Sequence, residues 1–215
     1  MTDKWLPENF KSFNLGFSNG NIFFCNIPKN ASTSIRNSLN LNHRKSYANE
    51  KYKIVILRNP YERALSSYNE ILKLRGDTAY IETKSTDFYE LSKTNFDESF
   101  YLFLKYINNR LYDSHVHRQS DWINGKPFMI DDYDYIFDFS NLTNDFNEFK
   151  NDLNISNKLL NLNKSKNKND KNYLLKDNKI KDLIENIYHE DIKIYNKKFN
   201  LELNGKEIHL PKKLF

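Results

Sequence analysis

The sequence predicts a single α/β domain, built on a small, mainly parallel sheet with helices on both faces. Short apolar runs alternate along the chain with longer amphipathic segments, and two of these runs are each followed within a few residues by a helix start. With 215 residues, 39% of them hydrophobic, the chain can bury one proper core. We therefore expect residues 1–215 to form one domain, with its core at about residues 20–200.

The expected elements alternate between strands and helices. The ranges are strand 22–26, helix 33–40, strand 53–58, helix 60–75, helix 96–111, strand 133–139, helix 143–153 and helix 178–198. The first two strands are continuous apolar runs, as expected for strands that are buried on both faces of a sheet. The longer segments repeat apolar residues at helical spacing.

The segment after the first strand reads as an anion-binding loop. Pro28 blocks extension of the strand, and the following hydroxyl residues are N-cap candidates for a helix, namely Ser32, Thr33 and Ser34. Backbone N–H groups at a helix start lack an intrahelical partner and favour negative charge, so they can hold phosphate or sulfate. Lys29 adds a positive charge. The alternative is simple helix capping beside a solvated lysine.

This loop differs from the nucleotide-triphosphate P-loop. The pattern G-x-x-x-x-G-K-[ST] needs two glycines and a lysine just before the hydroxyl residue. Here no glycine occurs between Asn21 and Gly76. An ordinary ATPase or GTPase is therefore disfavoured.

A second motif follows the next strand. Arg58 lies at the carboxyl end of that strand, where open parallel sheets bind their ligands, and Pro60 suits the first turn of a helix. On this helix Arg63 and Ser66 are surface neighbours, so Arg58, Arg63 and Ser66 can converge on one anion. Alternatively, Arg58 forms an ion pair at the strand end and Arg63 is a solvated charge. The apolar residues expected to face the sheet are Leu65, Tyr68, Ile71 and Leu72.

Together these motifs resemble the cofactor-binding signatures of a known family. P-K-N-A-S-T-S and R-N-P-Y-E-R-A-L-S-S-Y are similar to those of sulfotransferases that use 3′-phosphoadenosine 5′-phosphosulfate (PAPS), specifically the carbohydrate 2-O-, chondroitin and HNK-1 enzymes. Asp113 to Gln119 resembles the family segment D-S-H-x-x-x-Q, Tyr133 to Leu142 its following strand and turn, and Leu162 to Ser165 its late N-x-S element. The resemblance covers about residues 22–199 and implies a P-loop-like sulfotransferase fold.

The resemblance also implies roles for individual residues. The first loop would bind the 5′-phosphosulfate, with Lys29 on the bridging oxygen, and Arg58 and Ser66 would bind the 3′-phosphate of PAPS or of its product PAP. The other loop residues implied are Asn30, Ala31, Ser32, Thr33 and Ser34, and the late element adds Lys164 and Ser165. Many relatives carry a glycine where this chain has Asn30-Ala31, and Asn59 replaces the usual aspartate. Neither change removes a phosphate-binding donor.

Sulfuryl transfer requires in-line attack by an acceptor hydroxyl, a base and stabilisation of the leaving oxygen. Lys29 and the helix-start amides suit the last task, so no metal is expected. The base candidates are His43, which lies where the resembling 2-O-sulfotransferases carry their catalytic histidine, and His115, with Glu50 as a lesser candidate. Arg118 either pairs with an anionic group of the acceptor or is solvated.

Two stretches look irregular. Residues 76–94 are polar with scattered aromatics, and they either fold over an acceptor or form an ordinary surface excursion. Residues 157–182 contain eight lysines and three aspartates, a surplus equal to the net charge of +5. They form either a solvated loop or a basic rim around the cofactor or an anionic acceptor.

The remaining composition narrows the function classes. The basic charge suggests nucleic-acid binding as an alternative function. Helix-turn-helix, zinc-ligand and RNP-type motifs are absent from the sequence, however. The single cysteine, Cys25, lies in an apolar strand and is expected in the core, and it excludes an internal disulfide. Because the N-terminus lacks a signal peptide and no apolar segment is long enough to span a membrane, we expect a cytoplasmic protein of bacterial or viral source.

Three functions remain open at this point. The first is an active sulfotransferase acting on a hydroxyl of a carbohydrate or another small acceptor. The second is a catalytically inactive nucleotide-binding protein of the same fold, and the third is a kinase-like phosphoryl transferase. The sequence indicates neither the acceptor nor the oligomeric state.

Overall fold

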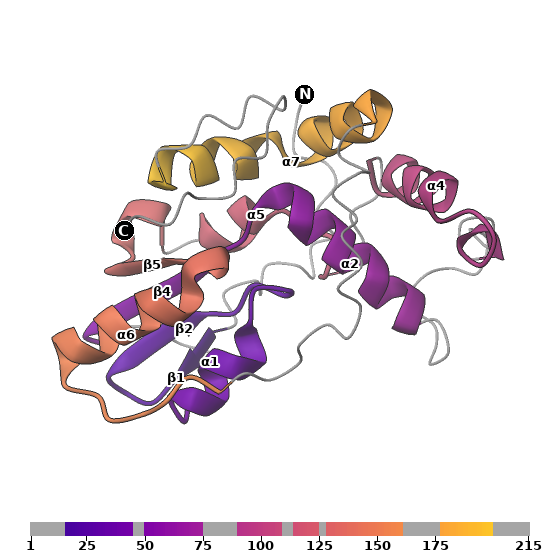
Figure 1. The fold of residues 1–215 in the computed structure, drawn as a ribbon. Coiled ribbons are helices and arrows are strands. Elements are labelled where there is room, and N and C mark those ends of the chain that lie inside the picture. The colour runs from indigo at the N-terminus through magenta and orange to yellow at the C-terminus, as the bar shows by residue number, and fades with distance from the viewer. Residues whose placement is uncertain are drawn as a thin grey trace.

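The computed structural model describes residues 16–44, 50–74, 90–108, 114–124, 128–160 and 177–199. In these ranges the chain forms an α/β unit in which a five-stranded sheet lies between two layers of helices (Figure 1). The α/β class and the helices on both faces agree with the sequence prediction.

The sheet is mixed instead of mainly parallel. Its strands are β1 (Gly16–Ser18), β2 (Ile22–Cys25), β3 (Asn42–Arg44), β4 (Tyr52–Leu57) and β5 (Tyr135–Asp138), in the order β3-β1-β2-β4-β5. β2, β4 and β5 are parallel, whereas β1 is antiparallel to both β2 and β3. The tight turn between β1 and β2 contains Gly20 with φ of 90°, and so short a connection can join only antiparallel strands.

The helices fit their expected positions closely. They are α1 (Ser32–Ser38), α2 (Pro60–Leu74), α4 (Phe96–Asn108), α5 (Gln119–Ile123), α6 (Leu142–Leu153) and α7 (Asn178–Phe199), with short 3₁₀ turns at Ile130–Asp132 and Phe139–Asn141. The five expected helices each begin within one residue of the expected start. Among the described strands and α-helices named above, the sequence did not predict β1, β3 and α5, each of three to five residues and therefore too short for a periodic signal.

Alternate residues of the central strands form two different cores. One face packs against α1 and α6 and contains Ile22, Phe24, Ile54 and Ile56. The opposite face packs against α5 and α7 and contains Phe23, Cys25, Val55 and Leu57. Cys25 is buried as expected: its Sγ donates a hydrogen bond to the Trp122 carbonyl at 3.8 Å, and burial raises the pKa of its thiol to about 12.

The apolar side of α2 does not face the sheet, so that prediction is wrong. Leu65, Tyr68, Ile71 and Leu72 pack instead into a separate core with α4 and α7. α2 starts at the edge of the sheet where β4 ends and extends away from the sheet to meet these helices (Figure 1). Its other side is therefore free to cover the loop that follows β2.

Candidate functional site

The loop between β2 and α1 has an unusual backbone. Lys29 and Ala31 have φ values of 71° and 56°, in the left-handed region that non-glycine residues rarely adopt, and Asn30 lies between them. Alternation of left- and right-handed residues turns successive N–H groups toward one concave side, as in anion-binding nests. The glycine that many resembling proteins carry in this loop would adopt such a conformation without strain.

The hydroxyl residues do not cap α1 in the way the sequence suggested. The N-cap is Ala31, which makes no side-chain cap, and Ser32 is already helical. The Ser32 hydroxyl instead donates to the Ile27 carbonyl at 2.8 Å, closing the loop on itself. The first intrahelical bond runs from Ile35 to Ala31, so the N–H groups of Ser32 and Thr33 have no partner within the helix.

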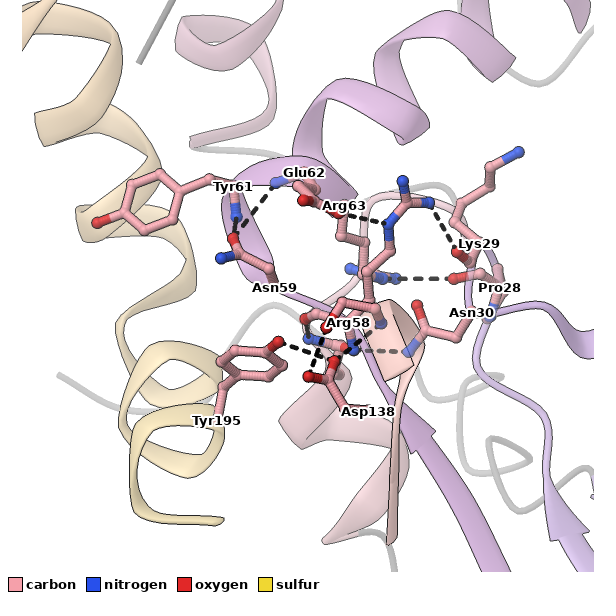
Figure 2. Close-up of polar contacts among 12 residues, drawn as sticks. Pro28, Lys29, Asn30, Arg58, Asn59, Tyr61, Glu62, Arg63, Asp138 and Tyr195 are labelled. Carbon is pink, nitrogen blue, oxygen red and sulfur yellow. Dashed lines mark hydrogen bonds and ion pairs between the residues drawn. The ribbon is translucent and has the colours of Figure 1, made fainter. Parts of the chain in front are cut away.

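Two arginines donate hydrogen bonds to backbone carbonyls of this loop (Figure 2). Arg63 Nε donates to the Pro28 carbonyl at 3.3 Å, and Arg58 Nη1 donates to the Lys29 carbonyl at 3.1 Å. In a trans peptide the C=O and N–H groups point in opposite directions, so the Lys29 N–H points away from Arg63. Arg63 thus helps to orient the Lys29 N–H toward the other side of the loop, whereas the Asn30 N–H donates to the Ile27 carbonyl at 3.3 Å.

Arg58 lies in the region predicted to bind an anion. Its guanidinium packs over the Phe139 ring, 4.2 Å from the ring centroid, and its Nε is 3.7 Å from Glu62 Oε2. Burial lowers the pKa of Arg58, and the charge of Glu62 partly offsets this effect. The strand-end ion pair that we considered as an alternative therefore exists, beside the contact with the loop.

Arg63 does not converge on the same anion, and it is not a solvated charge either. The side chain is 1% exposed, and its Nη1 and Nη2 donate to the carbonyls of His117 and His115 at 2.7 and 3.5 Å, in addition to the Pro28 contact. Burial lowers its pKa, while Tyr188, Asp191 and Asp121 act in the opposite direction. Arg63 is therefore a buried structural arginine that joins α2 to two chain segments.

The segment 115–120 is held in place by side chains of α2 and α7. The Ser67 hydroxyl donates to the His115 carbonyl at 2.6 Å, and the Tyr188 hydroxyl donates to the Val116 carbonyl at 2.9 Å. Asp191, which is buried, accepts hydrogen bonds from the N–H groups of Gln119 and Ser120 at 2.7 and 2.8 Å. The sequence did not indicate Asp191, because the two N–H groups that it binds lie about seventy residues earlier in the chain.

Gln119 connects this segment to the loop after β2 and to the end of β4. Its Oε1 accepts hydrogen bonds from Asn30 Nδ2 at 2.6 Å and from the Arg58 N–H at 2.9 Å, and its Nε2 donates to the Arg58 carbonyl at 2.8 Å. Asn30 is fully buried and also donates to the Ile56 carbonyl at 2.7 Å. Asn30 thus positions the loop through its side chain and has no exposed atoms for a ligand.

One stripe of α2 faces the loop. Glu62, Ser66 and Glu70 are spaced by four residues and lie on one side of the helix. Glu62 pairs with Arg58, and Glu70 Oε2 accepts a hydrogen bond from Lys29 Nζ at 3.0 Å. Ser66 is half-buried and lies on α2 between Glu62, which contacts Arg58, and Glu70, which contacts Lys29.

The two histidine candidates lie in different places. His115 follows the α4 region in the chain, and its carbonyl accepts hydrogen bonds from Ser67 and Arg63 of α2. His43 is exposed on the edge strand β3, with its ring packed edge-on against Phe17 at 5.6 Å between centroids. β3 is two strands away from β2, roughly 10 Å across the sheet. His115 is thus the candidate that lies beside α2, the helix that also contacts Lys29 through Glu70.

Glu50 lies at the wrong end of the sheet for the role considered. It precedes β4, whereas Arg58 follows it, and the six residues of that strand span about 20 Å. Arg118 is not simply solvated, because its Nε donates to the Ile187 carbonyl at 2.8 Å, next to a kink of α7 at Tyr188.

Other expected positions fall outside the described residues. These are Lys164, Ser165, Asp113 and most of the two irregular stretches. Within the described ranges, none of the helices combines the length and the apolar character that crossing a bilayer requires. Over the same residues, His, Cys, Asp and Glu side chains form no group of three or more that would bind a metal ion.

Comparison with known proteins defines the class of this chain. The family model described as Sulfotransferase family matches residues 17–198, which include both strand ends and the loop described above. The chain therefore belongs to the sulfotransferase family. Comparisons with curated proteins and with solved structures found no significant match.

Proposed function

We propose that the protein transfers a sulfuryl group from PAPS to a hydroxyl of a carbohydrate or another small acceptor. Family membership supports sulfuryl transfer. The observation that carries the donor assignment is the pair of cations at neighbouring strand ends: Lys29 in the loop after β2 and Arg58 directly after β4. Because β2 and β4 are parallel and adjacent, both cations lie at the same edge of the sheet.

The residues present fit a donor with two anionic groups. The N–H groups of Lys29, Ala31 and the first residues of α1 would hold the 5′-phosphosulfate, with Lys29 neutralising the charge that develops on the leaving oxygen. Arg58 and Ser66 would hold the 3′-phosphate. Within the donor-binding set the resemblance also includes Asn30, which acts by fixing the loop, and Lys164 and Ser165 of the late element.

We assign the general base to His115 ahead of His43. The family resemblance favoured the position of His43, but the contacts of the His115 carbonyl with Ser67 and Arg63 support a position of His115 beside α2, the helix whose Glu70 contacts Lys29. An imidazole there would accept the acceptor proton during attack on sulfur, and histidine titrates near neutral pH. No step of this mechanism uses a metal ion.

Donor binding is tested by calorimetry with PAP. The unaltered protein should bind PAP, and Arg58→Ala should weaken binding by about 10- to 100-fold, since a charged hydrogen bond contributes about 1.5–3 kcal/mol. Ser66→Ala should weaken it by a smaller factor. Absence of PAP binding, or binding that neither substitution changes, would contradict the donor assignment.

Transfer is tested with ³⁵S-labelled PAPS and a panel of glycans and small alcohols. Lys29→Ala and His115→Ala should each lower kcat, the latter by about 10²–10⁴-fold, while His43→Ala serves as the comparison. PAP binding without transfer to any acceptor would support the inactive binding protein instead. Magnesium-dependent transfer from ATP would support the kinase-like alternative.

A further inference from the structure

Both cations of the candidate site are paired with carboxylates of the same helix. Glu62 and Glu70 lie two turns apart on α2, with Ser66 between them, and they contact Arg58 and Lys29 respectively. The charges that would bind the donor are therefore neutralised internally by the α2 stripe. A donor anion must compete with these carboxylates.

The two pairs differ in the separation of the charged atoms and in the other partners of the cation. Arg58 has the Lys29 carbonyl and the Phe139 ring as further partners, and its separation from Glu62 is 3.7 Å. Lys29 Nζ is 3.0 Å from Glu70, and within the described part of the chain this carboxylate is its one partner. Because the lysine side chain is long and flexible, Glu70 determines where its ammonium group lies.

Glu70 is well suited to remain charged in this position. Burial opposes its ionisation, but the hydrogen bond from Lys29 and the charges of Lys29 and Lys73 outweigh burial and lower its pKa. Lys73 Nζ is 3.7 Å from the same oxygen. A carboxylate that is stabilised in this way is a weak proton acceptor, which argues against Glu70 as the general base.

We propose that Glu70 is a positioning residue that holds the Lys29 ammonium group beside the loop and releases it when the phosphosulfate binds. This inference rests on the proposed function of the same loop. Lys29 then exchanges one anionic partner for another instead of leaving water, so the ion pair with Glu70 competes with donor binding. Part of the donor affinity is lost to breaking the ion pair.

The experiment is a double-mutant cycle measured by calorimetry with PAP. The four proteins are the unaltered chain, Glu70→Gln, Lys29→Met and the double variant. Removal of a partly exposed ion pair should tighten PAP binding by about two- to fivefold in Glu70→Gln. In the Lys29→Met background the same substitution should change the dissociation constant by much less. Glu98→Gln, an exposed carboxylate of α4, is the matched charge control and should leave binding unchanged.

Each outcome of the cycle decides the inference. Equal tightening in both backgrounds would overturn it, because Glu70 would then act by general repulsion of the anion and not through Lys29. Unchanged or weaker binding in Glu70→Gln would overturn it as well. If the unaltered protein binds no PAP, the proposed function is contradicted. If it binds PAP but the cycle gives one of the two results above, only the role of Glu70 is contradicted.

Transfer kinetics supply a second readout that a purely structural role would not produce. Glu70→Gln should lower the KM for PAPS and change kcat by a smaller factor, while Glu70→Asp, which keeps the charge, should move both values back toward those of the unaltered enzyme. A large loss of kcat with unchanged KM would contradict the inference and indicate that Glu70 acts on the acceptor proton.

Discussion

Gln119 binds the backbone of Arg58 at both of its polar groups, accepting from the Arg58 N–H at 2.9 Å and donating to the Arg58 carbonyl at 2.8 Å. The same amide oxygen accepts from Asn30 Nδ2. One buried side chain therefore sets the position of the β4 end relative to the loop after β2. These are the two segments that carry the candidate cations.

Gln119→Met should loosen the site and destabilise the fold. Methionine fills a similar volume but removes one of the two acceptors of the Asn30 amide and leaves both Arg58 backbone groups without their partner, which should lower the free energy of unfolding by about 2–3 kcal/mol. Urea unfolding measures this change, and PAP calorimetry should show weaker binding. Asn124→Ala, at an exposed position after the same short helix, is the control. A Gln119→Met protein as stable as the unaltered one would contradict the role of the amide.

Substitution of Arg63 should mainly lower stability, whereas substitution of Arg58 should mainly weaken PAP binding. Arg63→Met removes a buried guanidinium from three carbonyls and should lower the free energy of unfolding by about 3 kcal/mol or more. Arg58→Met should affect PAP binding far more than stability. Both variants are compared by chemical denaturation and by calorimetry. The reverse order of effects would contradict our assignment of the two arginines.

The backbone at Ala31 should tolerate glycine but not a β-branched residue. At φ of 56° valine is strained, and Ala31→Val should destabilise the protein by about 1–2 kcal/mol and weaken PAP binding. Ala31→Gly should remain within about 1 kcal/mol of the unaltered protein, because glycine gains in the folded loop what it loses in the unfolded chain. Equal effects of the two substitutions would show that the left-handed conformation is unimportant.

Asp191 should give the stability a specific pH dependence. Burial raises its pKa above the ordinary value of 3.8, although Arg63 and the two N–H donors act in the opposite direction. The folded state then holds the proton more tightly than the unfolded state, so the contribution is fully present below pH 3.8 and is lost as the pH rises through the folded pKa. Asp191→Asn should lack this dependence.

The measurement is urea unfolding of both proteins at a series of pH values from about 3.5 upward. The stability of the unaltered protein relative to Asp191→Asn should fall as the pH rises above 3.8. A relative stability that rises over this range would mean that the N–H donors and Arg63 outweigh burial. In that case the direction of the pKa shift would be wrong.

Most of the helices and the central strands were predictable from the sequence because they depend on local patterns. Continuous apolar runs marked β2 and β4, and a proline after each run marked the point where the strand gives way to a loop or a helix. The short strands β1 and β3 were not predictable, since three residues carry no periodicity. Their antiparallel pairing is what makes the sheet mixed.

The sequence predicted where the candidate cations lie relative to the strands, but not which groups they contact. Lys29 and Arg58 follow strand ends, and the apolar runs in the sequence predict where those strands end. Arg63 is five residues from Arg58 and looked equally available in sequence. Its burial depends on the His115 and His117 carbonyls, which lie more than fifty residues away in the chain.

The sequence by itself determined the loop after β2, the arginine after β4 and the family to which they belong, because all three depend on residues that are close together in the chain. Only the tertiary structure decided which groups these charges contact. Glu70 is an ordinary helix glutamate in sequence, and it becomes the partner of Lys29 because α2 crosses the loop with its polar side. Hydrogen bonds and ion pairs act over a few ångströms in space, whatever the separation along the chain.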